Sequence, residues 1–186
     1  MVKFVPYDEN AHRSQFFELN VEYVSWVADE TQARHDVDVM AEVKQILREY
    51  VEAFLDDFLA IRPPKGIIYV LEDDGNVVGM GALKELEVGV GEIKRMYIRP
   101  EYRRRGLGKQ LLKKLMEKGK EFGYSTIRLS ARAATEKAYG TCHVALGQNT
   151  WLGGKNECSL HWDFLIDKPT VTIDDQQVLK EGMFTI

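Results

Sequence analysis

One loop of this 186-residue chain combines glycine with cationic side chains at a spacing suited to binding an anion. Its consecutive residues are Arg103, Arg104, Arg105, Gly106, Leu107, Gly108 and Lys109. Glycine carries no side chain, so successive backbone N–H groups can converge on one anion. If a helix begins here, its unpaired N–H groups and its dipole add positive potential. The loop therefore predicts a pyrophosphate site, to which the arginine and lysine side chains add charge-assisted hydrogen bonds.

A short glycine pattern is not specific, because many strand-to-helix turns carry glycine for tight packing. The segment is not a P-loop, since G-x-x-x-x-G-K-[ST] is absent, and it lacks the three spaced glycines of a dinucleotide fingerprint. Residues 94–120 hold eleven Lys or Arg and two Glu, whereas the whole chain has a formal charge of −4. A basic stretch in an acidic protein argues against general nucleic-acid binding and favours a local site for one polyanionic ligand.

The elements that position this loop follow from hydrophobic periodicity. We expect a strand at 3–5, helices at about 12–30 and 39–59, strands at 67–71, 77–83 and 91–98, a helix from 107 to about 122, and a strand at 124–130. Gly123 is predicted to end the last helix. The predicted buried stripe of the second helix consists of Val43, Ile46, Leu47, Tyr50, Val51, Phe54, Leu55 and Phe58.

Together with this order of elements, residues 92–112 resemble the acetyl-CoA motif of the GNAT superfamily of N-acetyltransferases. The resemblance rests on Ile-Arg-Pro-Glu-Tyr-Arg at 98–103, on Arg-x-x-Gly-x-Gly at 103–108 and on the apolar helix that follows. It covers about residues 1–130. It implies an α+β fold, an α/β sandwich whose mixed, mostly antiparallel central sheet is flanked by helices. It also implies acetyl-CoA as co-substrate and acetyl transfer to a primary amine, on a small molecule or a peptide, by direct attack.

The resemblance also assigns roles. The strand with Met96, Tyr97 and Ile98 is expected to bulge and to offer backbone groups to the pantetheine amides, while 104–109 bind the pyrophosphate. Glu92 lies six residues before Ile98, where relatives that acetylate histones place a general base. The plainer interpretation of Glu92 is a strand carboxylate paired with Lys94 or Arg128.

Beyond Ser130 the family pattern stops. The helix that usually carries an Asn and a Tyr, the latter often protonating the departing thiolate, has no counterpart. Tyr139 is the candidate replacement for this catalytic acid, although its spacing from the strand does not fit.

Residues 134–186 instead resemble the C-terminal segment of thermophilic-type metal-dependent aminopeptidases. The resemblance rests on Gly140-Thr-x-His143-x-Ala-x-Gly147, on Gly153-Gly and on His161-Trp-Asp163. His143, His161 and Asp163 match metal ligands of that family, but its metal-binding glutamates are missing, so these residues are weak candidates and no metal is expected.

The two resemblances predict a chimera joined between residues 129 and 136. Its parts are an acetyl-CoA-binding core (1–130) and a β-rich C-terminal segment (131–186) packed on the end of the sheet. Strands are expected in that segment at 141–146, 159–166, 171–173 and 177–179. Exposed strand edges left by imperfect packing would favour a homodimer.

Composition sets the remaining expectations. No apolar run is long enough to cross a bilayer, no secretory signal opens the chain, and its two cysteines lack C-x-x-C spacing. We therefore expect a cytoplasmic protein with neither nucleic-acid nor membrane partners. Two other functions stay open: a module that binds acetyl-CoA without turnover, and a metal-binding, aminopeptidase-like protein.

Overall fold

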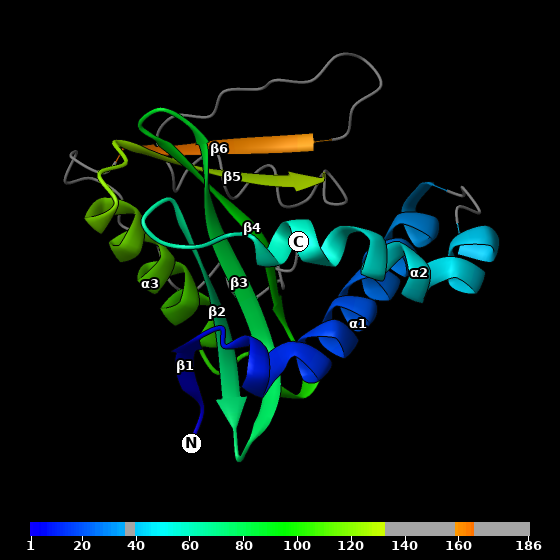
Figure 1. Ribbon diagram of the computed structural model, residues 1–186. Helices are drawn as coiled ribbons and strands as arrows, with labels where there is room; N and C mark the ends of the chain where they lie inside the picture. Colours follow the sequence, from blue (N-terminus) through cyan, green and yellow to red (C-terminus); the bar gives the residue numbers. More distant parts are fainter. Residues whose placement is uncertain (36–39, 133–158, 166–186) are drawn as a thin grey trace.

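The computed structural model describes residues 1–35, 40–132 and 159–165, which form a six-stranded sheet with helices on both faces (Figure 1). The strands lie in chain order: β1 (Lys3–Pro6), β2 (Gly66–Asp73), β3 (Asn76–Glu87), β4 (Val90–Ile98), β5 (Thr126–Arg132) and β6 (Ser159–Leu165). Only β4 and β5 are parallel, and every other neighbouring pair is antiparallel. The predicted mixed, mostly antiparallel sheet is thus confirmed. β6 corresponds to the strand expected at 159–166 and lies at the end of the sheet.

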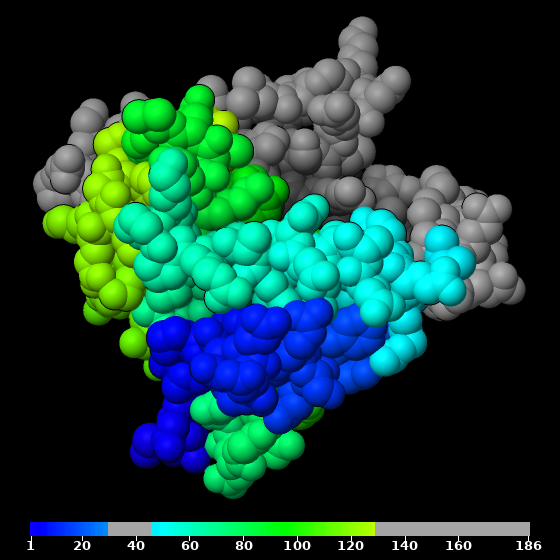
Figure 2. All heavy atoms as spheres, in the orientation of Figure 1, coloured from blue at the N-terminus to red at the C-terminus, as the bar shows by residue number. Residues whose placement is uncertain are grey.

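The helices divide between the two faces of the sheet (Figure 1). They are α1 (Glu9–His35), α2 (Met40–Leu59) and α3 (Leu107–Glu121), with a 3-10 turn, η1 (Pro100–Tyr102), before α3. The space-filling view shows α1 and α2 side by side across one face (Figure 2). None of the described helices combines the length and the apolar character needed to span a bilayer.

Alternation along the strands gives each face its own apolar core. Leu83, Ile93 and Ile127 pack with α3, whereas Met80 and Tyr97 pack with α1 and α2. Where α3 crosses β5, the helix carries Gly119, and a Cβ there would lie 2.5 Å from Ile127 Cδ1. The glycine therefore lets α3 approach the sheet closely.

α1 begins three residues before the predicted start, because Asp8 caps it. Asp8 Oδ1 accepts a hydrogen bond from the Ala11 N–H at 2.9 Å, and capping by Asp satisfies an otherwise unpaired donor. His12, which is buried, accepts from the Asp8 N–H at Nδ1 (2.8 Å) and contacts Glu72 Oε1 through Nε2 at 2.9 Å. These bonds fix the start of α1 against β2.

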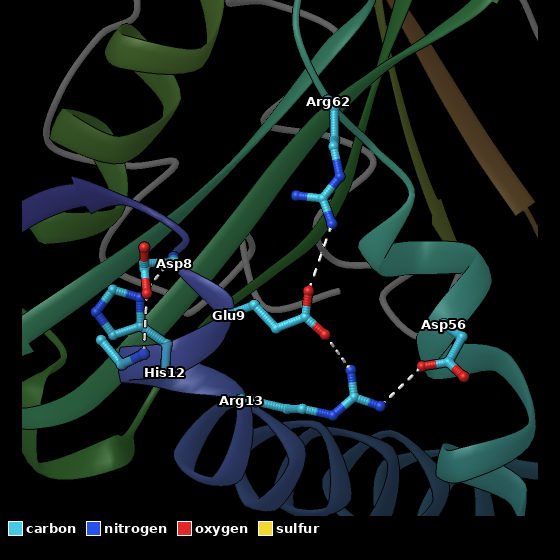
Figure 3. Close-up of polar contacts among 7 residues, drawn as sticks. Asp8, Glu9, His12, Arg13, Asp56 and Arg62 are labelled. Carbon is cyan, nitrogen blue, oxygen red and sulfur yellow. Dashed lines mark hydrogen bonds and ion pairs between the residues drawn. The ribbon is translucent and has the colours of Figure 1, made fainter.

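Ion pairs join the same end of α1 to the end of α2 (Figure 3). Arg13 lies 2.8 Å from Glu9 and 2.9 Å from Asp56 of α2. Arg62, in the connection to β2, lies 3.6 Å from Glu9. Because these side chains are exposed, each pair contributes little stability, but together they link three segments.

The predicted stripe of α2 is partly wrong. Leu47, Val51 and Leu55 are buried as expected, but Ile46 is 49% exposed and Tyr50 is 53% exposed. The buried positions recur every four residues and form one narrow row along the helix. Ile46 and Tyr50 each directly precede a residue of this row, so they lie about 100° away from it around the helix axis. Val43 belongs to the part of α2 whose side chains are not described.

Candidate functional site

β4 separates from β5 halfway along its length. The two strands pair only from Val90 to Ile93, and beyond that point β4 has no partner on this side among the described residues. On its other side, the register with β3 shifts between Lys94 and Tyr97. Arg95 within this interval has a φ of +52°, and Met96 has no register partner on either neighbouring strand. This is the predicted β-bulge, and it leaves a strand edge on which an extended amide chain could pair.

The loop after β4 presents a row of backbone N–H groups. Arg104 and Gly106 both have positive φ, at 60° and 72°, and α3 starts immediately afterwards. The first hydrogen bond of α3 runs from the Gln110 N–H to the Gly106 carbonyl at 3.1 Å. The N–H groups of residues 104–108 donate to no acceptor in the described part of the chain. Left-handed residues just before a helix start turn successive N–H groups toward one point and make an anion-binding concavity, called the nest below.

Two of the predicted arginines face the protein itself. Arg103 Nε donates to the Ile98 carbonyl at 2.8 Å, and its guanidinium lies over the rings of Trp26 and Tyr97 at 5.4 and 5.5 Å from their centroids. Arg103 Nη2 is buried and has no acceptor among the described residues.

Arg105 is exposed, as is Arg104, but its Nη2 donates to the Glu101 carbonyl at 2.8 Å. Arg103 and Arg105 thus hold the loop in shape while adding positive charge beside the nest.

Glu92 lies where β4 and β5 part, and only 5% of it is exposed. Its Oε1 is 2.9 Å from Lys94 Nζ, and its Oε2 is 4.0 Å from Lys84 Nζ. In register, Glu92 faces Lys84 on β3 and Arg128 on β5. The expected pairing with Lys94 is confirmed, and the carboxylate lies beside the opened strand edge.

The remaining candidates lie largely outside the described residues. Tyr139 and His143 fall there. His161 and Asp163 lie on β6, where they are register partners of Ser130 and Arg128. No group of three or more His, Cys, Asp or Glu that could hold a metal occurs among the residues described by the structure.

Sequence reasoning missed Arg95. Its guanidinium reaches between α1 and α2 and contacts aromatic rings of both helices. One signal was available: Lys94 and Arg95 are consecutive polar residues that interrupt an alternating strand, as a bulge does.

Comparison with known proteins agrees with this geometry. The model of the Acetyltransferase (GNAT) family matches residues 21–144, which extends past residue 130, where the resemblance was expected to end. At 134–144 this match favours the acetyltransferase assignment over the aminopeptidase resemblance.

Individual relatives match over shorter stretches. An uncharacterized N-acetyltransferase of Schizosaccharomyces pombe is 34% identical over 101 residues, covering 46% of this chain and 62% of the relative. Another from Lactobacillus delbrueckii subsp. lactis is 35% identical over 85 residues, covering 42% and 49%. The matched region therefore spans about half to three-fifths of these relatives.

Among solved structures, the PaiA N-acetyltransferase of Thermoplasma acidophilum, in complex with coenzyme A, superposes with a TM-score of 0.64 at 17% identity. That alignment covers 88% of this chain and 99% of the other, and it shows a shared fold. With the family model matching well over half of its residues, the chain belongs to the GNAT family of acetyltransferases.

Proposed function

We propose that this protein transfers an acetyl group from acetyl-CoA to a primary amine. The proposal rests on one observation: the opened edge of β4 and the nest at the start of α3 lie close together, both in the sequence and in the structure. Coenzyme A combines a pantetheine arm with two amides and a pyrophosphate, so its two kinds of polar group fit these two features. The structural neighbour from Thermoplasma acidophilum, in complex with coenzyme A, supports the same assignment.

The residues present fit the co-substrate. Met96 to Ile98 would pair with the pantetheine amides along the strand edge. The N–H groups of 104–109 would bind the pyrophosphate, and Gly106 supports this role because its left-handed conformation suits glycine. The buried, unpaired Nη2 of Arg103 lies between this loop and α1, where it favours an anionic or carbonyl ligand nearby.

When bound, acetyl-CoA supplies a thioester whose carbonyl carbon the amine attacks. The protein contributes mainly by positioning the two reactants, because reactants held in the right orientation react as if the step were intramolecular. Glu92 would remove the proton from the amine, through a water, with Lys94 and Lys84 keeping the carboxylate in place. Tyr139 is proposed to protonate the departing thiolate.

Several sequence-based predictions belong to the same proposal. They are the division into 1–130 and 131–186, the aminopeptidase-like origin of the second part, a cytoplasmic location, a homodimer, and the lack of nucleic-acid or membrane partners. The β5–β6 pairing supports the packing of the second part on the end of the sheet.

Calorimetric titration with acetyl-CoA tests the proposal first. A Cβ at position 108 would lie 3.7 Å from Ile98 Cδ1, an ordinary contact, so Gly108→Ala should fold and Gly108→Trp should fill the nest. We expect saturable one-to-one binding by the wild type and by Gly108→Ala, and none by Gly108→Trp. Absence of binding by folded wild type contradicts the proposal.

Thiol release from acetyl-CoA in the presence of amines then separates an enzyme from a binding module. Binding with no release for any primary amine would favour the binding-only alternative.

A further inference from the structure

Three arginines face α1 from the end of β4 and the loop after it: Arg95, Arg99 and Arg103. Arg99 pairs with the carboxylate of Glu22. Arg103 donates to the carbonyl of Ile98. No carboxylate contacts Arg95 or Arg103 among the described residues, and Arg95 differs from Arg103 in that its hydrogen bond goes to a neutral side chain, that of Asn20.

Arg95 lies in an aromatic cage between α1 and α2. Its Cζ is 3.9 Å from the ring centroid of Phe54, 5.0 Å from that of Phe58 and 5.7 Å from that of Tyr23. Its hydrogen bond to a described residue runs from Nη1 to Asn20 Oδ1 at 3.2 Å. Cation–π contacts stabilise a guanidinium but leave its in-plane donors available.

The neutral partner of Arg95 is itself fixed. Asn20 is fully buried, and its Nδ2 donates to the Phe16 carbonyl at 2.8 Å, so Oδ1 is presented to the guanidinium. Burial lowers the pKa of Arg95, and Tyr23 and Tyr50 oppose this effect. A partly buried cation with no counter-ion among the described residues is costly unless an anion joins it.

Arg95 is partly exposed. A guanidinium has five N–H donors, so donors remain beyond the bond to Asn20. A ligand oxygen can therefore approach this side chain.

The position of Arg95 connects this cage to the proposed reaction. It occupies the bulge, three residues after Glu92 and immediately before Met96. One segment of β4 thus carries the proposed base, the arginine that lies in the aromatic cage, and the strand edge that would pair with the pantetheine arm. A molecule bound at the cage would lie beside the proposed acetyl donor.

We propose that Arg95 binds a carboxylate of the acceptor, so the substrate is an amine that also carries a carboxylate, such as an amino acid. The inference rests on the proposed function and names its substrate class. A carboxylate matches the planar fork of a guanidinium and supplies a counter-ion, which the described residues do not provide. The aromatic rings of the cage shield this pair from water and strengthen it.

Paired acceptors test the inference. Thiol release from acetyl-CoA is measured with the common L-amino acids and their carboxamides, and with glycine, β-alanine, 4-aminobutanoate and 6-aminohexanoate and their amides. The second series varies the distance between amine and carboxylate. For the best acceptor we expect kcat/KM to be roughly 10- to 100-fold higher for the acid than for its amide, as one charge-assisted contact implies.

Two variants and a control make the test specific to Arg95. Arg95→Gln should abolish the preference for the acid. Asn20→Asp places a carboxylate beside the guanidinium, keeps the side-chain shape, and should also remove the preference. Arg48→Gln is the matched control: Arg48 lies over Phe17 at 4.8 Å, but it already pairs with Glu18, so the preference should persist.

The outcomes separate this inference from the proposed function. Equal transfer to acids and amides, or a preference that survives both variants, overturns the role of Arg95 while the acetyltransferase assignment stands. If no acceptor pair reacts, calorimetric titration of the protein saturated with coenzyme A decides. Binding of the acid but not the amide, lost in Arg95→Gln, supports the inference, and equal or absent binding overturns it. The acetyl-CoA titration described above tests the proposed function independently.

Discussion

Arg99 at the end of β4 and Glu22 in α1 form a two-point ion pair. Arg99 Nε lies 3.0 Å from Glu22 Oε2, and Nη2 lies 2.6 Å from Oε1. The hydrogen bonds to Glu22 raise the pKa of Arg99. This parallel geometry fixes the distance between α1 and the residue from which the anion-binding loop departs.

Replacing Glu22 by Gln should lower the free energy of unfolding by about 1 kcal/mol, since both side chains are partly exposed and solvent screens the pair. Urea unfolding of Glu22→Gln, Arg99→Gln and the double variant measures the coupling. Strictly additive effects of the two substitutions would show that the pair contributes nothing.

Gly106→Ala should weaken acetyl-CoA binding by roughly tenfold, because a side chain disfavours the left-handed backbone that shapes the nest. Its Cβ would lie 3.9 Å from the nearest atom, so a steric clash is not the cause. Gly75→Ala is the matched control: φ is +77° in the β2–β3 turn, and apart from its chain neighbours no atom of the described residues lies within 4 Å of the added Cβ. Both variants should lose about 1 kcal/mol of stability, but only Gly106→Ala should change the calorimetric Kd.

Gly119→Ala should destabilise the protein by about 1–2 kcal/mol, although alanine favours helices. The new Cβ would lie 2.5 Å from Ile127 Cδ1, and Ile127 is fully buried, so it cannot move away without cost. Ile127→Val removes this methyl group and should rescue Gly119→Ala in thermal unfolding. If Gly119→Ala alone raises the Tm, the close contact between α3 and β5 is incorrect.

The pair between Glu18 and Arg48 predicts a pH effect. Hydrogen bonds from Arg48 hold the pKa of Glu18 below its ordinary value of 4.5. The pair therefore stabilises the fold above that value, and its contribution is lost as the pH falls through the lower pKa of the folded state.

Arg48→Met should thus be less stable than the wild type at pH 7. The difference in the free energy of unfolding should be small, because both groups are exposed, and it should disappear in acid. Denaturant unfolding at a series of pH values measures it. A difference that stays constant to pH 2 would point to lost packing on Phe17 as its source.

Glu92→Gln should lower kcat by roughly 100-fold, the lower end for loss of a general base, without changing the Kd for acetyl-CoA. Glu85→Gln is the control, because Glu85 lies on the neighbouring strand and pairs with Lys65 at 2.6 Å. Unaltered kcat in Glu92→Gln would assign Glu92 a structural role in its lysine pairs.

The sequence was informative where local rules decide the structure. Gly123 was expected to end α3, and it has the left-handed φ of +83° that such an end requires. The order of the elements followed from periodicity and turn residues, and the bulge in β4 followed from the family resemblance.

Contacts between distant segments could not be predicted in the same way. The cage around Arg95 takes its residues from α1 and α2, and the rings lie more than thirty positions apart in sequence. The exposure of Tyr50 depends on which row of α2 faces the sheet, a property of the packing of α2 and not of its own periodicity.

The early separation of β4 from β5 has a thermodynamic consequence. The hydrogen bonds of a strand inside a sheet are normally made to neighbouring strands, but here part of one edge of β4 would make them to a small molecule. Ligand that binds only the folded state adds stability by mass action, about 2.7 kcal/mol at a hundred times its Kd. The free energy of unfolding would then rise with the concentration of acetyl-CoA, and the protein would be least stable where its co-substrate is scarce.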